Sequence, residues 1–193
     1  MEKYNVNDDF FYFWIVSSKY PNSYWLKYDW ENNPNYLEFK ENVRIPNSES
    51  IILKFSLNEK VKTLSFLKYD YFKSDALPLV SERFANLIKK YASDTIQFIK
   101  AYIFQSEQKI AEVFVPVFLL KKDIIDKKLS VFDEELEDYT KIYLNKGFII
   151  NENIFMVEKY IVVREDFVKD CKKNKIKGVD FYKEPFENPL YIR

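Results

Sequence analysis

Two segments of the chain carry apolar residues at helical spacing. The first stripe falls at i, i+3, i+4 and i+7 and consists of Phe84, Leu87, Ile88 and Tyr91. Ser81 stands where an N-cap hydroxyl accepts a free backbone N–H, and Glu82 follows in the first turn, where the helix dipole favours an acid. The pattern predicts a helix from Glu82 to Tyr91 that buries Phe84, Leu87 and Ile88.

The second helical pattern lies near the C-terminus. It opens at Arg164 and Glu165, turns Phe167, Val168 and Cys171 inward, and has lysines near its end. It predicts a helix from Glu165 to Lys173 with Phe167 buried. Gly178 follows, where a residue that takes a positive φ is useful after a helix.

The other apolar runs have strand character. Leu53, Phe55 and Leu57 alternate with polar neighbours, which is the period of a half-buried strand. Pro116 lies within an apolar run and suggests an edge strand or a bulge. The predicted strands lie at 10–16, 24–28, 51–57, 95–99, 113–120, 160–163 and 179–181, with further strands suggested by Ile142, Leu144, Phe148 and Ile150.

The two helical regions match each other at one constant offset. The matched pairs are Val80 with Val163, Glu82 with Glu165, Phe84 with Phe167, Lys89 with Lys172, Lys90 with Lys173, Ile96 with Val179 and Phe98 with Phe181. The match indicates a degenerate repeat of a strand–helix–strand unit. Chance is the alternative, since amphipathic helices between strands resemble one another.

Together these patterns predict an α+β fold with a mixed or mainly antiparallel sheet and two principal amphipathic helices. No Pro-, Ser- or Gly-rich linker divides the 193 residues, so we expect a single domain over 1–193. Within it, 1–60 is aromatic and strand-rich, and 61–193 contains both helices.

Composition narrows the setting of the protein. The 30 basic and 30 acidic side chains cancel, which is not typical of a phosphate-backbone binder, although Lys–aromatic pairs such as Lys54–Phe55 leave nucleic-acid binding as an alternative. The apolar runs are too short to span a bilayer, and the polar start is unlike a secretory signal. Cys171 is the only cysteine, so no internal disulfide forms. We expect a cytoplasmic protein with no membrane or nucleic-acid partner.

Residues that are absent exclude several chemistries. The chain has no histidine, which excludes Ser-His-Asp and Cys-His nucleophile systems and histidine metal sites. Its two glycines, Gly147 and Gly178, cannot build a phosphate-binding loop. We therefore expect no catalytic site, metal or cofactor. An enzyme that uses carboxylates remains the alternative, and its candidates are Asp70, Glu82, Asp123, Asp126 and Glu165.

Four ordered segments resemble a known bacterial family. They are Lys68 to Phe72 leading into Leu77 to Phe84, then Ile124 to Asp126 with Ser130, then Ile154–Phe155 leading to Ile161 to Val163, and finally Gly178 to Phe181. This order is similar to that of the immunity proteins of polymorphic toxin systems, in the predicted immunity family numbered eleven. The resemblance covers roughly Phe66 to Tyr182, and Arg164 stands where the family commonly has a second serine cap. It implies a cytoplasmic antidote that binds a cognate protein toxin and blocks it.

The candidate contact residues form two groups. Aromatic side chains near turns suit interface anchors, with core filling as the alternative, and they are Tyr20, Tyr24, Trp25, Tyr28 and Trp30. An acidic run suits the basic cleft of a nuclease toxin, with a solvated helix start or loop as the alternative, and it comprises Asp133, Glu134, Glu135, Glu137 and Asp138. The expected protein is a monomer or weak homo-oligomer that neutralises a toxin by occluding its active site. The alternatives are the carboxylate enzyme and a general protein-interaction module.

Overall fold

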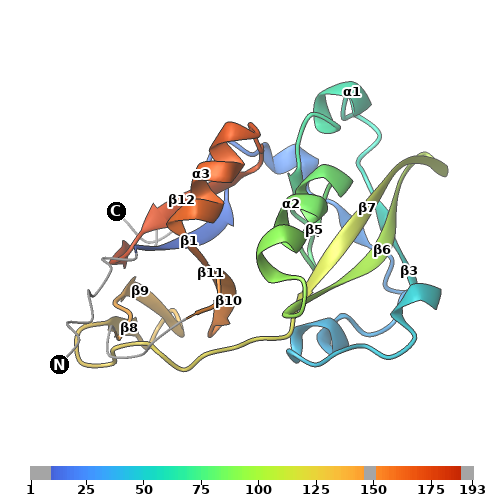
Figure 1. The fold of residues 1–193 in the computed structure, drawn as a ribbon. Helices are drawn as coiled ribbons and strands as arrows, with labels where there is room; N and C mark the ends of the chain where they lie inside the picture. Colours follow the sequence, from blue (N-terminus) through green and yellow to red (C-terminus); the bar gives the residue numbers. More distant parts are fainter. Residues whose placement is uncertain (1–9, 146–150, 188–193) are drawn as a thin grey trace.

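The protein has an α+β fold, as the sequence patterns predict. The computed structural model describes residues 10–145 and 151–187, so Gly147, Phe148 and Ile150 lie outside the described residues. The α-helices in this part are α1 (Thr63–Phe66), α2 (Glu82–Ala92) and α3 (Glu165–Lys173), and short 3-10 turns lie at η1 (Asn22–Tyr24), η2 (Tyr36–Lys40) and η3 (Ser48–Ser50). In Figure 1, α2 and α3 lie beside each other between two sheets.

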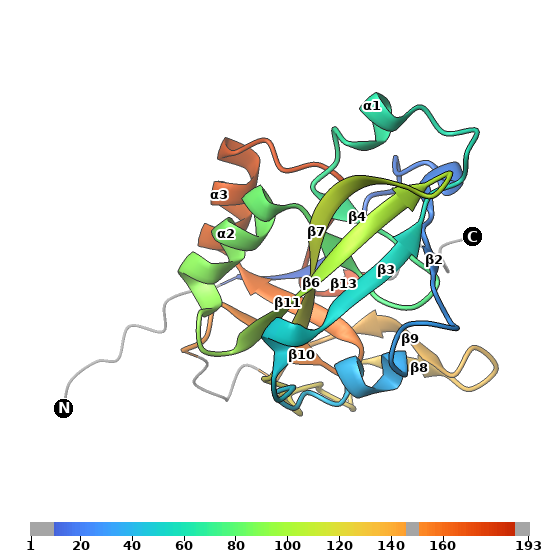
Figure 2. The same cartoon turned by 90° about the vertical axis from the view of Figure 1, so that its right-hand side faces the viewer.

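The larger sheet has six strands in the order β2-β3-β6-β7-β5-β4. Its strands are β2 (Lys27–Tyr28), β3 (Ile52–Ser56), β4 (Tyr71–Phe72), β5 (Leu79–Val80), β6 (Ile96–Gln105) and β7 (Gln108–Phe118). Only β3 and β6 pair in parallel. A parallel bridge from Leu26 to Ser74 links the two edges, so the sheet curls into a barrel-like shape, seen from the side in Figure 2.

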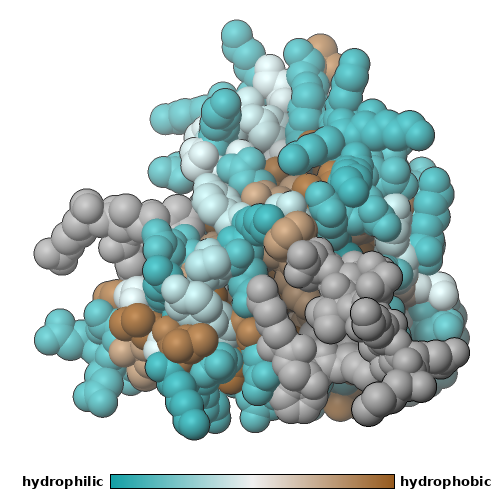
Figure 3. Space-filling view, turned by 60° about the vertical axis from the view of Figure 1, so that its left-hand side comes forward, coloured by the Kyte–Doolittle hydropathy of each residue, from teal (hydrophilic) through white to brown (hydrophobic). Residues whose placement is uncertain are grey.

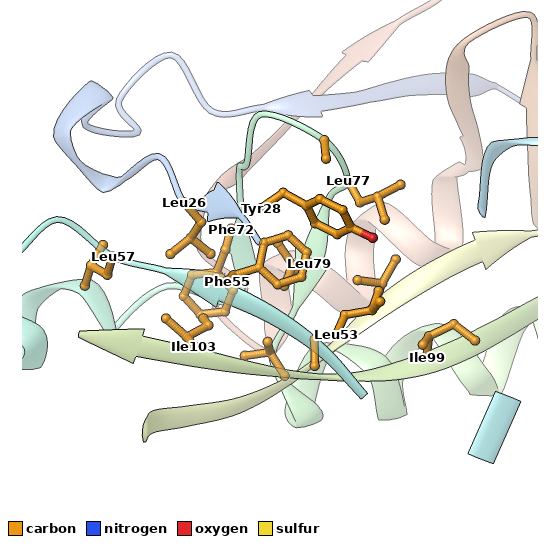
Figure 4. Close-up of a cluster of buried hydrophobic side chains, with 14 of the residues drawn as sticks. Leu26, Tyr28, Leu53, Phe55, Leu57, Phe72, Leu77, Leu79, Ile99 and Ile103 are labelled. Carbon is orange, nitrogen blue, oxygen red and sulfur yellow. The ribbon is translucent and has the colours of Figure 1, made fainter. Parts of the chain in front are cut away.

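The inside of this curled sheet is a hydrophobic core. Leu53, Phe55 and Leu57 point into it at alternate positions, which confirms the predicted period. Figure 4 shows their side chains meeting those of the neighbouring strands, including Leu26, Phe72, Leu79, Ile99 and Ile103. The segment predicted as a strand at 24–28 is shorter than expected, because η1 occupies its start and only Lys27–Tyr28 pairs with β3.

Pro116 does not lie on an edge strand, contrary to the sequence-based prediction. It lies in β7, which has β6 on one side and β5 on the other. Pro116 lies opposite Phe98 of β6, at a position where a backbone N–H would point away from β6 and toward β5. However, β5 pairs with β7 only at Val80 and Phe114, so no acceptor of the sheet is waiting for that N–H. The missing N–H of proline therefore costs no ladder bond.

A four-stranded sheet with the order β10-β11-β1-β12 forms the second half of the molecule, and a three-stranded sheet with the order β13-β9-β8 adjoins it. The first contains β1 (Phe11–Val16), β10 (Ile154–Val157), β11 (Tyr160–Arg164) and β12 (Val179–Lys183). The second contains β8 (Val131–Asp133), β9 (Asp138–Ile142) and β13 (Phe186–Glu187). Successive β1 residues face opposite ways, so Trp14 packs toward the helices and Phe13 toward the three-stranded sheet.

Both predicted helices form and bury their predicted stripes. Ser81 caps α2 by accepting the backbone N–H of Phe84, whereas Arg164 gives α3 no side-chain cap. Phe84, Leu87, Ile88 and Phe167 are all buried. The rings of Phe84 and Phe167 stack on each other at 6.2 Å, and Trp14 contacts both. The two helices therefore share one core.

The strand–helix–strand repeat is present in the structure, and it extends further than the sequence indicates. The order β4-β5-β7-β6 around α2 corresponds to β10-β11-β1-β12 around α3. In the first unit, Tyr71 pairs with Val80, Val80 with Phe114, and Phe114 with Lys100. In the second unit, Ile154 pairs with Val163, Val163 with Tyr12, and Tyr12 with Lys183. The registers therefore agree at the constant offset of the sequence match. The same register across three strand pairs argues against chance similarity of two helices.

The two units differ in the origin of their central strand. In the first unit it is β7, which directly follows β6, and in the second it is β1, from the N-terminal part of the chain. Each unit also reaches the end of the other's helix. Arg83 donates to the carbonyl of Asn174 after α3, and Asn153 donates to that of Tyr91 in α2. The two accepting carbonyls, those of Tyr91 and Asn174, are equivalent at the offset of the repeat, so the contacts between the units are reciprocal.

Candidate functional site

The acidic run forms the turn of a β-hairpin rather than the start of a helix. Strands β8 and β9 pair in antiparallel fashion, and residues 134–137 connect them. Glu134, Glu135 and Glu137 are exposed. Asp133 is half-buried, and its carboxylate accepts the backbone N–H groups of Glu135 and Leu136, which fixes the turn. Three carboxylates therefore project into solvent from this hairpin.

Asp138 is buried, which corrects its placement in the exposed acidic run. The hydroxyl of Tyr160 donates to its carboxylate, and Lys159 Nζ lies 2.7 Å from it. These contacts attach the hairpin to the turn between β10 and β11. Asp138 therefore supports the hairpin and does not belong to its outer surface.

The hairpin also exposes a group of apolar side chains that the sequence patterns did not identify. Leu129, Val131, Phe132 and Leu136 are between 45% and 59% exposed. The ring of Phe132 packs edge-on against Tyr139 of β9 at 5.1 Å. These four exposed apolar residues lie within eight positions of the chain, and exposed apolar side chains gathered on one element are typical of interaction sites. The only sequence signal was apolar residues beside an acidic run, which is equally typical of a buried strand.

We call the exposed residues Leu129, Val131, Phe132, Glu134, Glu135, Leu136 and Glu137 the acidic hairpin surface. A cavity of about 380 Å³ lies beside it and is lined by Phe132, Tyr139, Glu158 and Lys121, among others. Lys121 and Glu158 form an ion pair at 3.1 Å across the far wall of this cavity. Figure 3 shows the side of the molecule that carries these sheets, where small hydrophobic areas lie in a mainly hydrophilic surface.

The aromatic candidates divide into exposed and buried residues. Trp30 is 57% exposed and Trp25 41% exposed, so both are available to a partner. Tyr28 is buried, and its hydroxyl donates to the carbonyl of Pro34, so the prediction that it contacts a partner is wrong. Tyr20 is also buried, and Tyr24 is half-buried with its ring against Phe66. Core filling, the alternative reading, holds for Tyr20 and Tyr28.

A cleft of about 770 Å³ opens beside Trp25, between β2 and the turn after β6. Lys73 Nζ lies 3.7 Å from the centre of the Trp25 ring, a cation–π contact, and burial lowers the pKa of Lys73. Asp75 accepts the backbone N–H of Tyr28 and the indole N–H of Trp30. Asp75 therefore fixes the C-terminal end of β2 and the side chain of Trp30, a role that its isolated position in the sequence did not indicate.

Three of the five carboxylate candidates have local partners of their own. Asp70 is buried and binds Arg83, Ser81 and the backbone of Lys177. Asp126 accepts the N–H groups of Lys128 and Leu129, and Glu165 pairs with Lys169 at 3.4 Å. Glu82 and Asp123 are exposed. Within residues 10–145 and 151–187, no three His, Cys, Asp or Glu side chains are grouped as a metal site requires.

Cys171 lies on the buried face of α3, as the helical pattern predicts. Burial, and then the nearby charges of Asp170 and Asp70, raise the pKa of its thiol to about 12. The thiol is therefore protonated at neutral pH, and it is a poor nucleophile.

Comparison with known proteins gives no family for this chain: no protein-family model and no curated protein matches it. In the described part of the chain, no helix combines the length and apolar character that crossing a membrane requires.

Proposed function

We propose that this protein is an immunity protein that binds a cognate bacterial toxin domain and occludes its active site, acting by stoichiometric binding rather than turnover. The acidic hairpin surface is the proposed contact. Two observations support the proposal: the ordered four-segment resemblance to the immunity family, and the exposure of apolar and acidic side chains on one supported hairpin. The second observation carries the choice of surface.

The hairpin has the composition of a recognition surface. Phe132 and Leu136 supply apolar area, and fully burying such a side chain contributes about 1.5–3 kcal/mol. Glu134, Glu135 and Glu137 supply negative charge that steers a basic partner and mainly raises its association rate. A nuclease toxin has such a basic cleft, since its substrate is a polyanion.

The structure of the hairpin suits binding without a large rearrangement. Asp133 fixes the turn, and Asp138, its partner in the strand pair beside the turn, is held by Tyr160 and Lys159. A pre-ordered surface loses less conformational entropy on binding than a loop that must first become ordered.

If the gene beside this one encodes a toxin domain, co-expression of the two proteins tests the proposal. We expect the wild-type protein to protect cells and to form a complex with the toxin domain on gel filtration. Death of the cells despite folded protein, with no complex formed, would refute the immunity role.

A charge reversal tests the surface separately. Replacing Glu134, Glu135 and Glu137 with lysine should weaken toxin binding at least tenfold at low salt, and Phe132→Ala should increase the dissociation rate. The matched control reverses three exposed acids elsewhere, Glu41, Glu49 and Glu107, and should change binding less than twofold. Equal affinities for both triple variants would show that another surface contacts the toxin.

A general protein-interaction module is the second candidate, and the exposed Trp25 and Trp30 beside the 770 Å³ cleft favour it. If Trp30→Ala weakens binding of a partner more than the hairpin variants do, the cleft is the main contact.

A further inference from the structure

The two repeated units differ at one sheet edge. In the first unit, the outer edge of β6 is covered by the segment that runs through η3 into β3. The side-chain amide of Gln97 accepts the N–H of Ile45 and donates to its carbonyl, and Lys100 pairs with Ile52. The first unit therefore shows what a covered edge looks like in this fold.

The equivalent edge of the second unit is the outer edge of β12, and no strand of the described residues pairs with it. At the two ends of β12, the carbonyl of Gly178 accepts the N–H of Ser17, and the N–H of Glu184 donates to the carbonyl of Phe11. Because alternate residues of an antiparallel strand bond to the same neighbour, the backbone groups of Asp180 and Tyr182 also face β1. The backbone groups of Val179, Phe181 and Lys183 consequently point outward. Asp180 occupies the position of Gln97, but its carboxylate accepts Ser18 N instead of holding a covering segment.

A cavity with both apolar and polar walls adjoins this edge. It has a volume of about 430 Å³ and lies between the end of α3 and β12, where Ile176, Val179 and Phe181 form its apolar part and Lys172, Asp180 and Tyr182 its polar part. An extended segment along β12 would point alternate side chains toward this cavity, as β3 points Leu53 and Phe55 into the core beside β6.

The rim of the edge is strongly basic. Lys172, Lys173, Lys175, Lys177 and Lys183 are all exposed, and none of them forms an ion pair within residues 10–145 and 151–187. Three acids lie nearby: Asp170 accepts the hydroxyl of Tyr91, Asp180 accepts Ser18 N, and Glu184 accepts the N–H of Leu144. These neutral donors leave the three carboxylates charged, but the five lysines outnumber them, so the edge presents a net positive charge.

We infer that the outer edge of β12 is a second interaction surface, which binds an acidic extended segment of a protein partner by strand addition. The outward backbone groups supply the hydrogen bonds, the cavity accepts an apolar side chain, and the lysines select acidic neighbours in the bound segment. A second copy of this chain is a poorer occupant, because pairing β12 with itself would bring two sets of five lysines together.

Selection of random ten-residue peptides displayed against the full-length protein tests the inference. We expect enrichment of peptides in which Asp or Glu alternates with apolar residues. In the complex, the amides of Val179, Phe181 and Lys183 should become protected from hydrogen exchange. Failure to enrich acidic peptides, or protection at a different site, would overturn the assignment.

Charge reversal at Lys172, Lys175 and Lys177 should weaken the selected peptides at least tenfold, whereas reversal at Lys60, Lys62 and Lys127 should change affinity less than twofold. Lys183→Pro removes one outward N–H while leaving the bonds to β1, and it should also weaken binding. Equal binding by all variants would refute the inference. Concentration-dependent dimerisation that the first triple reversal abolishes would identify a second copy as the occupant and would equally overturn it.

Discussion

Asp70 provides the sharpest test of whether a candidate carboxylate serves structure or chemistry. Its buried carboxylate accepts from Ser81 Oγ at 2.8 Å, from Arg83 Nε at 3.1 Å and from the backbone N–H of Lys177 at 3.0 Å, and Arg83 Nη2 bonds to it as well. It therefore connects the cap of α2 to the loop after α3. We expect its removal to destabilise the junction of the two units.

The magnitude follows from these contacts. Removing one partner of a buried ion pair costs about 3–5 kcal/mol, but the Arg83 side chain is 55% exposed, so water replaces part of the loss. The N–H of Lys177 and the hydroxyl of Ser81 lose their acceptor in Asp70→Ala, which adds about 1–3 kcal/mol for the groups left unsatisfied. We expect Asp70→Ala to lower the free energy of unfolding by about 4 kcal/mol. Asp70→Asn should lower the free energy of unfolding by about 2–3 kcal/mol. The amide nitrogen that replaces Oδ2 cannot accept the hydrogen bonds that Arg83 Nη2 and the N–H of Lys177 donate to Oδ2.

Urea unfolding of the purified protein measures these differences, with an unchanged m-value as the sign of an intact two-state transition. Asp123→Asn is the control, since Asp123 is exposed and its replacement should stay within about 0.5 kcal/mol of wild type. Asp70→Asn within the same 0.5 kcal/mol would refute the structural role. A gain in stability would favour a strained, functional carboxylate instead.

Two further predictions concern single residues of the second unit. Gly178 has φ +97°, and a Cβ there would lie 2.5 Å from the carbonyl oxygen of Tyr71, so Gly178→Ala should cost about 2–4 kcal/mol in urea unfolding. Glu107→Gly, at φ 65°, should cost nothing, and equal effects of both would contradict the strain argument. Cys171 has a pKa raised by burial from 9.0 to about 12, so between these values only the unfolded chain loses the proton. The stability that this thiol contributes is complete below pH 9 and falls by about 1.4 kcal/mol per pH unit above it. The difference in unfolding free energy between wild type and Cys171→Ala should therefore shrink as the pH rises above 9. A difference that is independent of pH from 8 to 11 would refute the shift of the pKa.

The sequence predicts the helices well because local signals agree with tertiary packing there. The cap at Ser81 and the stripe ending in Tyr91 are local signals that favour a helix, and the same pattern recurs at Phe167. The alternation from Leu53 to Leu57 likewise predicts its strand. In these segments one face is apolar over several turns or positions, so burial can be read from spacing.

The contact residues could not be predicted in the same way, because their exposure depends on distant parts of the chain. Tyr28 and Trp30 look alike in the sequence, but the curl of the six-stranded sheet buries Tyr28 and leaves Trp30 outside. Asp138 resembles its acidic neighbours, but Tyr160 and Lys159 of another sheet enclose it. The position of Pro116 within the sheet depends on the short length of β5.

The repeat separates what builds the fold from what distinguishes this protein. Residues that match between the units, such as Phe84 and Phe167, lie in the shared core, so similarity between the units is accounted for by folding alone. In the described part of the chain, the β2–β3 segment of the first unit and the β8–β9 hairpin of the second have no counterpart, and no described strand pairs with the outer edge of β12. Packing of a common core does not require exposed Trp30, exposed Phe132 or the exposed lysines beside β12. Selection for binding is a sufficient reason for these features, and the three surfaces that carry them are where substitutions should change recognition while the fold persists.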